Sequence, residues 1–366
     1  MTTSAIARLN DFGQSPWYDN LARPLLTGGG LKKLVEVDGI RGVTSNPTIL
    51  DKAIGAGEGY DEQLAKCAEQ GLSIEETYWD VVIEDIQGAT EVLRPVYDAQ
   101  NGADGFVSLE VAPTVAHDTQ ATIAMARSLH DRVDRPNLMI KIPATREGVP
   151  AIEESIAAGI TVNVTLIFSL ERHAEVIEAY LTGLERLVAA GGDPSTIASV
   201  ASFFVSRVDT ETDRRLPEDS PLRGKAAVAN AKLAYALFRE KFSGARWDAL
   251  AAKGARLQRP LWASTSTKNP AYPSTLYVDE LIGPDTVNTL APASIEALQK
   301  GEGTQRADTV SADVEGARQV MADLAAAGID FDDVTATLER EGVDAFAGSF
   351  NDAFGTIEKR RAEVAS

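Results

Sequence analysis

The chain has 366 residues, 44% of them hydrophobic and 6% aromatic, which is enough apolar material for a substantial folded core. It carries 54 acidic against 35 basic residues, and its formal net charge is -19 at pH 7. This negative charge makes nucleic acids and anionic membrane surfaces poor partners, so an anionic ligand would need cations gathered locally at its site.

The cysteine content and the N-terminus indicate the compartment. The single cysteine, Cys67, cannot form a disulfide within the chain, and the first residues, MTTSAIARLND, lack the apolar run of a secretory signal. No apolar stretch approaches the roughly 20 residues needed to cross a bilayer. We therefore expect a cytoplasmic protein without membrane partners.

Eight short segments with strand-like composition recur between longer helical patterns. In chain order they are SPWYDN (15–20), GVTS (42–45), GFVSLEV (105–111), LMIKIP (138–143), TVNVTLIF (161–168), SVASFFVS (199–206), RPLWAST (259–265) and TVNTLAP (286–292). One helical pattern, residues 73–99, begins with a capping box of Ser73 and Glu76. The alternation predicts the α/β class and a (β/α)8 TIM barrel. The alternative, a doubly wound sheet, would show fewer strands and a G-x-G-x-x-G turn, which the sequence lacks.

We predict a single domain over residues 1–366, with additional helices in a C-terminal tail from about residue 313. Residues 302–312 are polar enough to form a long surface connection before this tail. Within the tail, Phe346, Phe350 and Phe354 are spaced four residues apart. An aromatic stripe of this period normally packs on the core, here the barrel, and the alternative is a lid over the barrel mouth.

Catalytic groups of a barrel gather at the carboxyl ends of its strands, so polar residues near those ends are candidates. Lys141 interrupts the apolar segment LMIKIP and is expected to be partly desolvated. Desolvation disfavours the ammonium and favours the free amine, which can attack a carbonyl carbon to form a Schiff base. A lysine that extends its head to solvent is the simpler interpretation of this strand alone.

The segment TVNVTLIF has one polar face, formed by Thr161, Asn163 and Thr165. Inside a barrel these buried groups would need hydrogen-bond partners, and a bound substrate could supply them. A solvated edge strand would show the same alternation.

Two later strand ends carry cations. Arg207 follows SVASFFVS, and its planar guanidinium suits bidentate recognition of phosphate, while Lys268 ends the segment ASTSTK. Each could instead pair with nearby acids such as Asp209. Two cations after consecutive strands nevertheless favour one phosphate site. The other side chains of interest in these segments are Ser202, Phe204, Ser206, Ser264 and Ser266.

Three more polar residues lie at or near predicted strand ends. Asp19 could make an Asx turn, and Asn46, which precedes a proline, could cap the following helix. Glu110 lies within the apolar segment VSLEV and has no comparable structural role. A carboxyl group in such surroundings tends to have a raised pKa, which suits it to proton transfer near neutral pH.

Metal and hydrolase chemistry are not indicated. His117, His130 and His173 fall in helical patterns away from the strand ends and lack metal-ligand spacing. The sequence also lacks the G-x-S-x-G elbow of hydrolases and the phosphate-binding P-loop. We expect no metal and no cofactor, and we expect imine chemistry on a phosphorylated carbonyl compound.

The segments GVTSNPTIL (42–50) and LMIKIPATREGVPAI (138–152) resemble the two signature segments of transaldolases. VSLEV, GITVNVTLIFS, ASFFVSRVD and DTVNTLAP resemble further segments of that family in the same order, so the likeness covers roughly residues 10–300. The resemblance implies a pentose phosphate pathway enzyme that acts on small sugar phosphates. It would transfer a dihydroxyacetone unit from sedoheptulose 7-phosphate to glyceraldehyde 3-phosphate, giving erythrose 4-phosphate and fructose 6-phosphate. Whether the protein is a monomer or a homodimer stays open.

The same resemblance implies residue roles. Lys141 would form the imine, and Asp19 would take the C4 hydroxyl proton as the C3–C4 bond breaks. Glu110 would act as acid and base through a water near Thr165. The implied binding residues are Asn46, Asn163 and Ser202 for the three-carbon unit, Phe204 as a wall, and Arg207, Ser266 and Lys268 for the phosphate. Lys268 departs from the arginine of the shorter family segment A-S-x-R-N, so either Ser264 or Ser266 could contact the phosphate.

Two other functions compete with transfer. Related Schiff-base aldolases split fructose 6-phosphate and release free dihydroxyacetone, but they are much shorter and tend to carry glutamine and tyrosine in place of Glu110 and Phe204. A non-catalytic barrel serving as a binding subunit would not need Lys141, Glu110 and Asp19 together. The sequence therefore favours transfer.

Overall fold

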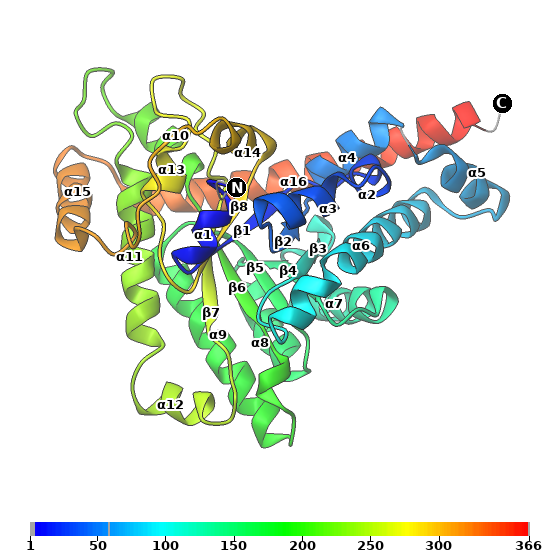
Figure 1. Cartoon of the computed structure of the whole chain (residues 1–366), viewed down its shortest axis with the longest axis horizontal. Helices are drawn as coiled ribbons and strands as arrows, with labels where there is room; N and C mark the ends of the chain where they lie inside the picture. Colours follow the sequence, from blue (N-terminus) through cyan, green and yellow to red (C-terminus); the bar gives the residue numbers. More distant parts are fainter. Residues whose placement is uncertain (1–3, 58, 365–366) are drawn as a thin grey trace.

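The computed structural model describes residues 4–57 and 59–364 and contains a closed barrel of parallel strands (Figure 1). The strands are β1 (Gln14–Asp19), β2 (Gly42–Thr44), β3 (Phe106–Glu110), β4 (Leu138–Pro143), β5 (Val162–Ile167), β6 (Ser199–Phe204), β7 (Gln258–Ala263) and β8 (Thr286–Leu290). They neighbour one another in chain order, and β8 closes the barrel by pairing with β1. Each strand overlaps one predicted segment, so the (β/α)8 prediction is confirmed.

Helices surround the barrel and extend beyond it. The first half of the chain contributes α1 (Ala7–Asp11), α2 (Arg23–Thr27), α3 (Gly30–Asp38), α4 (Pro47–Ala56), α5 (Asp61–Glu69), α6 (Ile74–Ala99), η1 (Pro113–Val115), α7 (Thr119–Val133), α8 (Gly148–Ala157) and α9 (Leu170–Ala189). The second half contributes η2 (Pro194–Thr196), α10 (Ser206–Arg215), α11 (Ala226–Lys241), α12 (Ala245–Ala251), α13 (Leu276–Asp279), α14 (Pro292–Gln299), α15 (Val314–Ala326) and α16 (Phe331–Val364). The predicted capping box begins α6. There the Glu76 carboxylate accepts from the Ser73 N–H at 2.8 Å, and the Ser73 hydroxyl accepts from the Glu76 N–H at 3.2 Å.

Trp17 is fully buried and lies inside the barrel, below the carboxyl ends of the strands. Trp17 lies two residues before Asp19 and therefore on the same face of β1. Its indole N–H donates to the Asp104 carboxylate at 2.9 Å, which fixes the ring. Gly42 opens β2 beside this ring, and a Cβ at Gly42 would overlap it. The glycine of the GVTS segment is therefore required for the packing below the strand ends.

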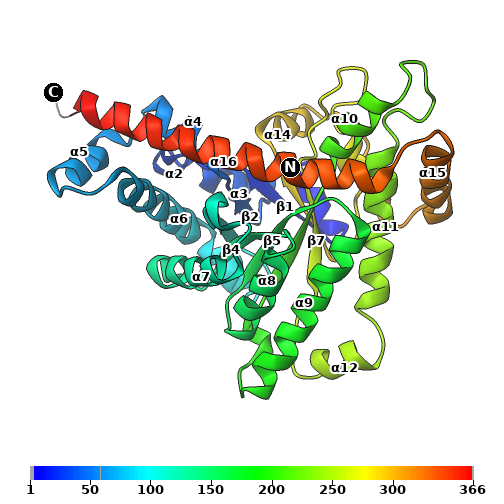
Figure 2. The same cartoon turned by 180° about the vertical axis from the view of Figure 1, so that it is seen from behind.

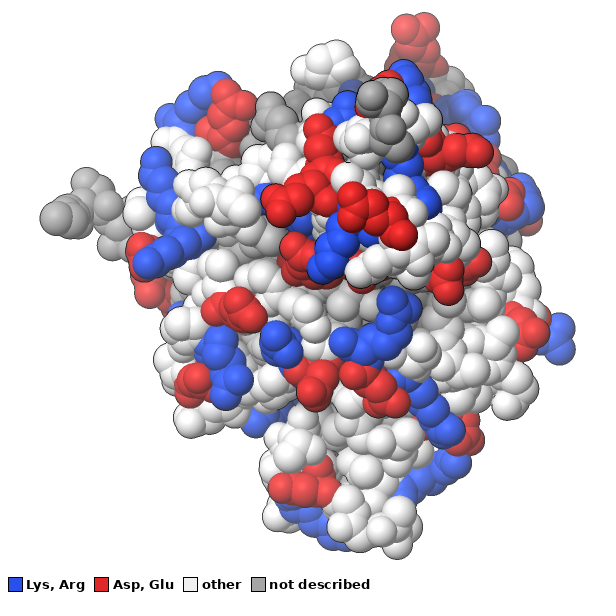
Figure 3. Space-filling view, turned by 90° about the vertical axis from the view of Figure 1, so that its right-hand side faces the viewer, with Lys and Arg blue, Asp and Glu red and all other residues white. Residues whose placement is uncertain are grey.

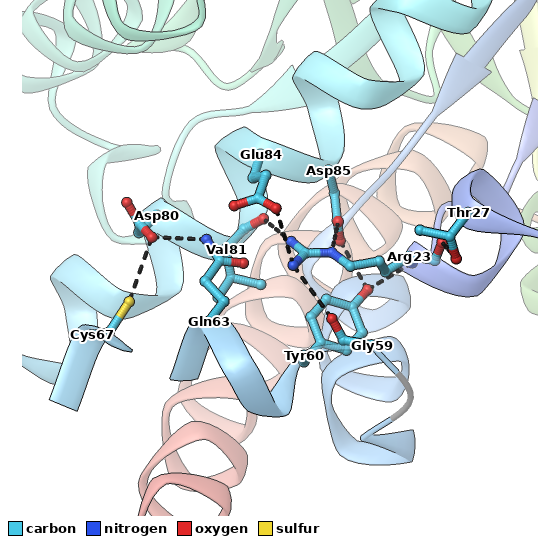
Figure 4. A network of polar contacts seen from close by, with 10 residues as sticks. All are labelled: Arg23, Thr27, Gly59, Tyr60, Gln63, Cys67, Asp80, Val81, Glu84 and Asp85. Atoms are coloured by element: carbon cyan, nitrogen blue, oxygen red, sulfur yellow. Dashed lines mark hydrogen bonds and ion pairs between the residues drawn. The ribbon is translucent and has the colours of Figure 1, made fainter. Parts of the chain in front are cut away.

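A buried polar network supports the segment that follows β1 (Figure 4). The Arg23 guanidinium donates to the Asp85 carboxylate at 2.7 Å. The Tyr60 hydroxyl donates to the other oxygen of Asp85 at 2.8 Å and accepts from the Arg23 N–H at 2.9 Å. Burial raises the pKa of Asp85, and the neighbouring Arg23 charge opposes that rise. The network joins α2, α5 and α6 and anchors the chain four residues after Asp19.

The C-terminal tail packs on the barrel and its helices. α15 lies against α11, and α16 runs across the carboxyl ends of the strands and along α4, α5 and α6 (Figure 2). The rings of Phe350 and Phe354 lie 5.0 and 5.5 Å from that of Tyr78 on α6, as expected for a packing face. Phe346 instead lines the cavity described below, as expected for the lid alternative. Residues 302–312 form the predicted connection without regular secondary structure.

Surface charge is mixed on the face shown in Figure 3, where basic and acidic side chains lie interspersed. Within residues 4–57 and 59–364, no helix combines the length and the apolar character needed to cross a membrane. The cations relevant to an anionic ligand lie in the cavity at the carboxyl ends of the strands.

Candidate active site

A cavity of about 110 Å³ opens at the carboxyl ends of the strands. It is lined by Asp19, Thr44, Asn46, Lys141, Thr165, Ser202, Phe204, Arg207, Ala263, Ser264, Ser266, Lys268, Thr289, Ala291 and Phe346. The structure thus brings most of the predicted site residues to one place. Glu110 and Asn163 do not line the cavity itself, but both contact residues that do.

Lys141 is buried near the end of β4, with 5% of its surface exposed, and its side chain lines the cavity and does not extend to the outer surface of the protein. Its partner on β3 in the barrel register is Glu110, and the two side chains form a buried ion pair. The distance from Lys141 Nζ to Glu110 Oε2 is 3.1 Å, and Nζ also donates to the Ser45 carbonyl at 3.3 Å. The predicted desolvation of the lysine is present, and its proton has an adjacent carboxylate acceptor.

Glu110 lies in apolar surroundings on the side of Lys141 away from the cavity. A narrow space next to its carboxyl group is walled by Tyr78 and Trp79 of α6 and by Phe350 of α16. Desolvation raises the pKa of Glu110, and the positive charge of Lys141 opposes the rise. The expectation of a raised pKa is met, and the direct contact between the carboxylate and the lysine is new.

Asp19 ends β1 and points into the cavity. Its Oδ1 accepts from the Thr44 hydroxyl at 2.6 Å, and the Thr44 oxygen lies 2.6 Å from the Thr289 oxygen. Because Thr44 has one hydroxyl proton, it accepts from Thr289 while it donates to Asp19. Desolvation raises the pKa of Asp19, and the Thr44 hydrogen bond and the nearby cations, first among them Lys141, oppose the rise. Within the described part of the chain, Asp19 is thus directed to the cavity and not to an Asx turn.

Asn46 has both of the roles considered for it. Its Oδ1 accepts from the Ile49 N–H at 3.1 Å and caps α4, and the residue also lines the cavity. The cap occupies the amide oxygen, which leaves the Nδ2 group as a possible donor to a ligand.

Asn163 belongs to a polar layer inside the barrel. Its Oδ1 accepts from the Ser202 hydroxyl at 2.7 Å, and its Nδ2 donates to the Ser108 hydroxyl at 2.9 Å. Asn163 is fully buried and orients Ser202, which lines the cavity. Direct contact between Asn163 and a substrate stays a prediction.

Thr165 occupies an irregular part of β5. The pairing of β5 with β6 shifts register between Val164 and Ile167, and Leu166 has a positive φ of 59°. Such a bulge redirects the side chains beside it and is common next to active sites. The buried Thr165 hydroxyl lines the cavity and has no hydrogen-bond partner among the described residues, so it is a polar group that a ligand can satisfy.

Two cations define one end of the cavity. Arg207 lies in the first turn of α10, directly after β6, and Lys268 lies in the loop after β7. Among the described residues neither forms an ion pair, and Asp209 instead accepts from a backbone N–H of α11. The Arg207 guanidinium lies 5.2 Å from the ring centre of Phe204 and 5.9 Å from that of Phe346. Both cations are therefore available to an anion, as expected for a phosphate site.

Ser264 and Ser266 both line this end of the cavity. The Ser264 hydroxyl lies 2.9 Å from that of Ser206, and the Ser266 hydroxyl lies 3.1 Å from that of Ser294. Either serine can reach an anion held by the two cations, so the choice between them stays open.

Comparison with known proteins identifies the family of the chain. A family model described as transaldolase/fructose-6-phosphate aldolase matches residues 16–357. The chain belongs to this family. A protein named transaldolase from a Parafrankia species is 50% identical over 366 residues, with 99% of each chain covered. A transaldolase from Thermobifida fusca is 51% identical, with 98% of this chain and 99% of the relative covered. Transaldolase 1 from Streptomyces avermitilis is 52% identical, with 97% and 95% covered.

Several cavity residues of this transaldolase-family chain were not predicted. Thr44 and Thr289 end or nearly end their strands, and their period-two position could have identified them. The Ser45 carbonyl that accepts from Lys141 has no signal in the sequence, because every residue has such a group. Phe346 showed only a helical period, which does not indicate where the helix lies.

One prediction about the histidines was wrong. His117 lies in a turn between η1 and α7, not in a helix, because the helix begins only after the N-cap Asp118. His130 and His173 lie in α7 and α9 as expected. The described residues contain no group of three or more histidine, cysteine or acidic side chains that could hold a metal ion.

Proposed function

We propose that the protein is a transaldolase that transfers a dihydroxyacetone unit through a Schiff base on Lys141. The donor would be sedoheptulose 7-phosphate and the acceptor glyceraldehyde 3-phosphate, with erythrose 4-phosphate and fructose 6-phosphate as products. The observation that carries this proposal is the buried Lys141–Glu110 pair, which opens on a cavity that holds Asp19 at one side and two unpaired cations at one end. The names and full-length coverage of the relatives support it.

The first step is formation of the imine. Glu110 accepts a proton from the Lys141 ammonium, and the free amine attacks the C2 carbonyl carbon of the donor. The C2 oxygen then receives one proton from the attacking nitrogen and the proton held by Glu110, which passes through a water near Thr165 because Glu110 does not line the cavity. The oxygen leaves as water and gives the iminium. The 3.1 Å contact supports direct proton transfer between the two side chains, and burial against the apolar wall raises the pKa of Glu110 above its ordinary value, which favours the protonated carboxyl group between the two transfers.

The second step is cleavage of the C3–C4 bond. Asp19 accepts the proton of the C4 hydroxyl, the C4 aldehyde forms, and the bonding electrons pass to the iminium to give an enamine. The cleaved aldehyde leaves and the acceptor aldehyde takes its place. The enamine carbon attacks this aldehyde, and Asp19 returns the proton to the new hydroxyl. The hydrogen bond from Thr44 keeps the Asp19 carboxylate in position for both transfers.

The cationic end of the cavity would bind the substrate phosphate. Arg207 supplies a planar fork of donors and Lys268 a single ammonium, with Ser264 or Ser266 as a further donor. Since the whole chain carries a formal charge of -19, these local cations are needed to hold an anionic substrate.

Three broader expectations are also proposals. We propose that barrel and tail act as one domain, because α16 packs on α4, α5 and α6 and places Phe346 in the cavity. A cytoplasmic location and a monomeric or homodimeric state stay predictions.

Reduction with borohydride tests the mechanism. In the presence of fructose 6-phosphate, we expect a reduced dihydroxyacetone adduct on the peptide that contains Lys141, identified by mass spectrometry. Lys141→Ala should form no adduct and should lose transfer, whereas Lys33→Ala, at an exposed position of α3, should keep both. An adduct on another lysine, or full transfer by Lys141→Ala, would contradict the proposal.

A further inference from the structure

Phe346 brings the C-terminal helix into the cavity. It lies midway along α16, which crosses the carboxyl ends of the strands (Figure 2), and 5% of its surface is exposed. The centre of its ring lies 5.6 Å from Lys141 Nζ and 5.9 Å from the guanidinium carbon of Arg207. One aromatic side chain therefore contacts both the proposed nucleophile and the proposed phosphate-binding cation.

The position of this ring is fixed from both sides along the helix. Gly342, one turn earlier, lies so close to the bulge of β5 that a Cβ there would stand 2.9 Å from the Leu166 side chain and 3.7 Å from Arg207 Nη1. Phe350, one turn later, packs on the rings of Tyr78 and Trp79 of α6. Because residues four apart share one helix face, the three positions form one continuous contact line. α16 is thus a packed part of the site and not a loose cover.

We propose that Phe346 is a specificity-determining residue that favours transfer of the dihydroxyacetone unit over its release into water. This inference rests on the proposed transaldolase function. The covalent intermediate has two fates. In transfer, the enamine carbon attacks an acceptor aldehyde. In release, the enamine is protonated at carbon and water adds to the resulting iminium carbon. The C–N bond then breaks, giving free dihydroxyacetone and the Lys141 amine. Release needs a water beside Lys141, and the apolar ring of Phe346 occupies that region.

Phe346 also acts on the phosphate end of the site. The Arg207 guanidinium is in contact with two rings, Phe204 and Phe346, both within the 6 Å range of cation–π attraction. These contacts restrict the guanidinium without using its hydrogen-bond donors, which stay free for a phosphate. Removal of one ring should therefore weaken the binding of phosphorylated donors more than that of donors without a phosphate.

The test compares three variants. Phe346→Ala removes both the cover and the ring, Phe346→Leu keeps an apolar cover without a ring, and Phe354→Ala is the control on the same helix, where the ring packs on Tyr78 outside the cavity. The measured ratio is dihydroxyacetone release without acceptor over transfer with acceptor, with fructose 6-phosphate as donor. We expect Phe346→Ala to raise this ratio about tenfold or more. Phe346→Leu and Phe354→Ala should leave it nearly unchanged.

Michaelis constants provide the second measurement. Phe346→Leu should raise KM for fructose 6-phosphate about threefold, with little change for unphosphorylated fructose, because only the cation contact is lost. If Phe346→Ala fails to fold, Phe346→Ser takes its place in the release-to-transfer measurement, because it also removes the apolar cover beside Lys141. An unchanged ratio in the folded variant would overturn this inference alone, and equal KM values in Phe346→Leu and the parent protein would overturn the role of the Arg207 contact. Absence of transfer in the unaltered protein would overturn the proposed function and this inference together.

Discussion

Replacement of Glu110 by glutamine tests the buried pair at the centre of the site. Glutamine keeps the size of the side chain and can still accept a hydrogen bond from Lys141, but it cannot take the proton of the ammonium. Loss of a positioned general acid and base lowers rates by about 10²–10⁴. Since the carboxylate lies 3.1 Å from Nζ and no water is needed between them, we expect the full effect on kcat for transfer. Formation of the borohydride-trapped adduct should slow by a similar factor.

The pH dependence of kcat/KM provides a second test of the role of Glu110. Glu110 must be ionised to accept the proton, so kcat/KM should fall as the pH decreases through the pKa of the pair. Because burial raises the pKa of Glu110, this fall should begin above the ordinary value of 4.5. Glu36→Gln, at an exposed position of α3, is the matched control and should change neither rate nor profile. If Glu110→Gln keeps more than about a tenth of kcat, or an unchanged acid limb, the proton transfer assigned to Glu110 is refuted.

Three further predictions concern stability. Gly42→Ala should lower the free energy of unfolding by about 1–3 kcal/mol in urea titrations, because the added methyl group overlaps Trp17; an unchanged midpoint would contradict this packing. Asp85→Ala should cost about 3–5 kcal/mol by the same method, because the buried Arg23 guanidinium loses its buried partner and keeps only the exposed Glu84; a loss below about 1 kcal/mol, typical of a surface pair, would contradict the network. Asp209 has a folded-state pKa raised to about 6 from 3.8, mainly by burial, so its stabilising contribution is complete below 3.8 and lost as the pH rises through 6. Asp209→Asn should remove a pH dependence of about 3 kcal/mol across that window, and melting curves from pH 4 to 7 that keep the parent's slope would refute it.

Much of the fold follows from local sequence patterns. The strands could be predicted because each is a short apolar run bounded by helical patterns, and the start of α6 because a capping box is a local hydrogen-bond motif. Period-two alternation also predicted that Asn163 and Thr165 face the barrel interior, where both are buried. Catalytic groups of a barrel gather at the carboxyl ends of its strands, so the polar residues near those ends were expected to lie close together. In the structure one cavity is lined by Asp19, Lys141, Arg207 and Lys268.

The direct contact between Glu110 and Lys141 could not be predicted in the same way. Alternation gives the face of a strand on which a side chain lies, but not the stagger between neighbouring strands. In the barrel, Glu110 and Lys141 are register partners, and this pairing depends on the closure of all eight strands. A water-mediated role for Glu110 was therefore the most that its strand and the resemblance could imply.

The position of Phe346 likewise could not be predicted from the spacing of apolar residues in its helix. Its spacing with Phe350 and Phe354 predicts one apolar helix face, but this face has two different environments. Phe350 and Phe354 pack on Tyr78 of α6, whereas Phe346 lines the cavity. At Gly342 the helix closely approaches the side chain of Leu166, which has a positive φ in β5. These contacts join the tail to distant parts of the chain, so the spacing of its phenylalanines could not distinguish a packing helix from a lid.

The same helix links the environments of the two groups that exchange protons in the first step. Phe350 forms part of the apolar wall that desolvates Glu110, and Phe346, one turn away, lies against Lys141. Desolvation raises the pKa of Glu110 and so favours its protonated form. The face of the Phe346 ring attracts a positive charge at Nζ, whether that of the ammonium or that of the iminium. The chemistry of the barrel therefore depends on a helix that begins 190 residues after Lys141 in the chain. Truncation before α16 should consequently abolish transfer even where the barrel strands still form.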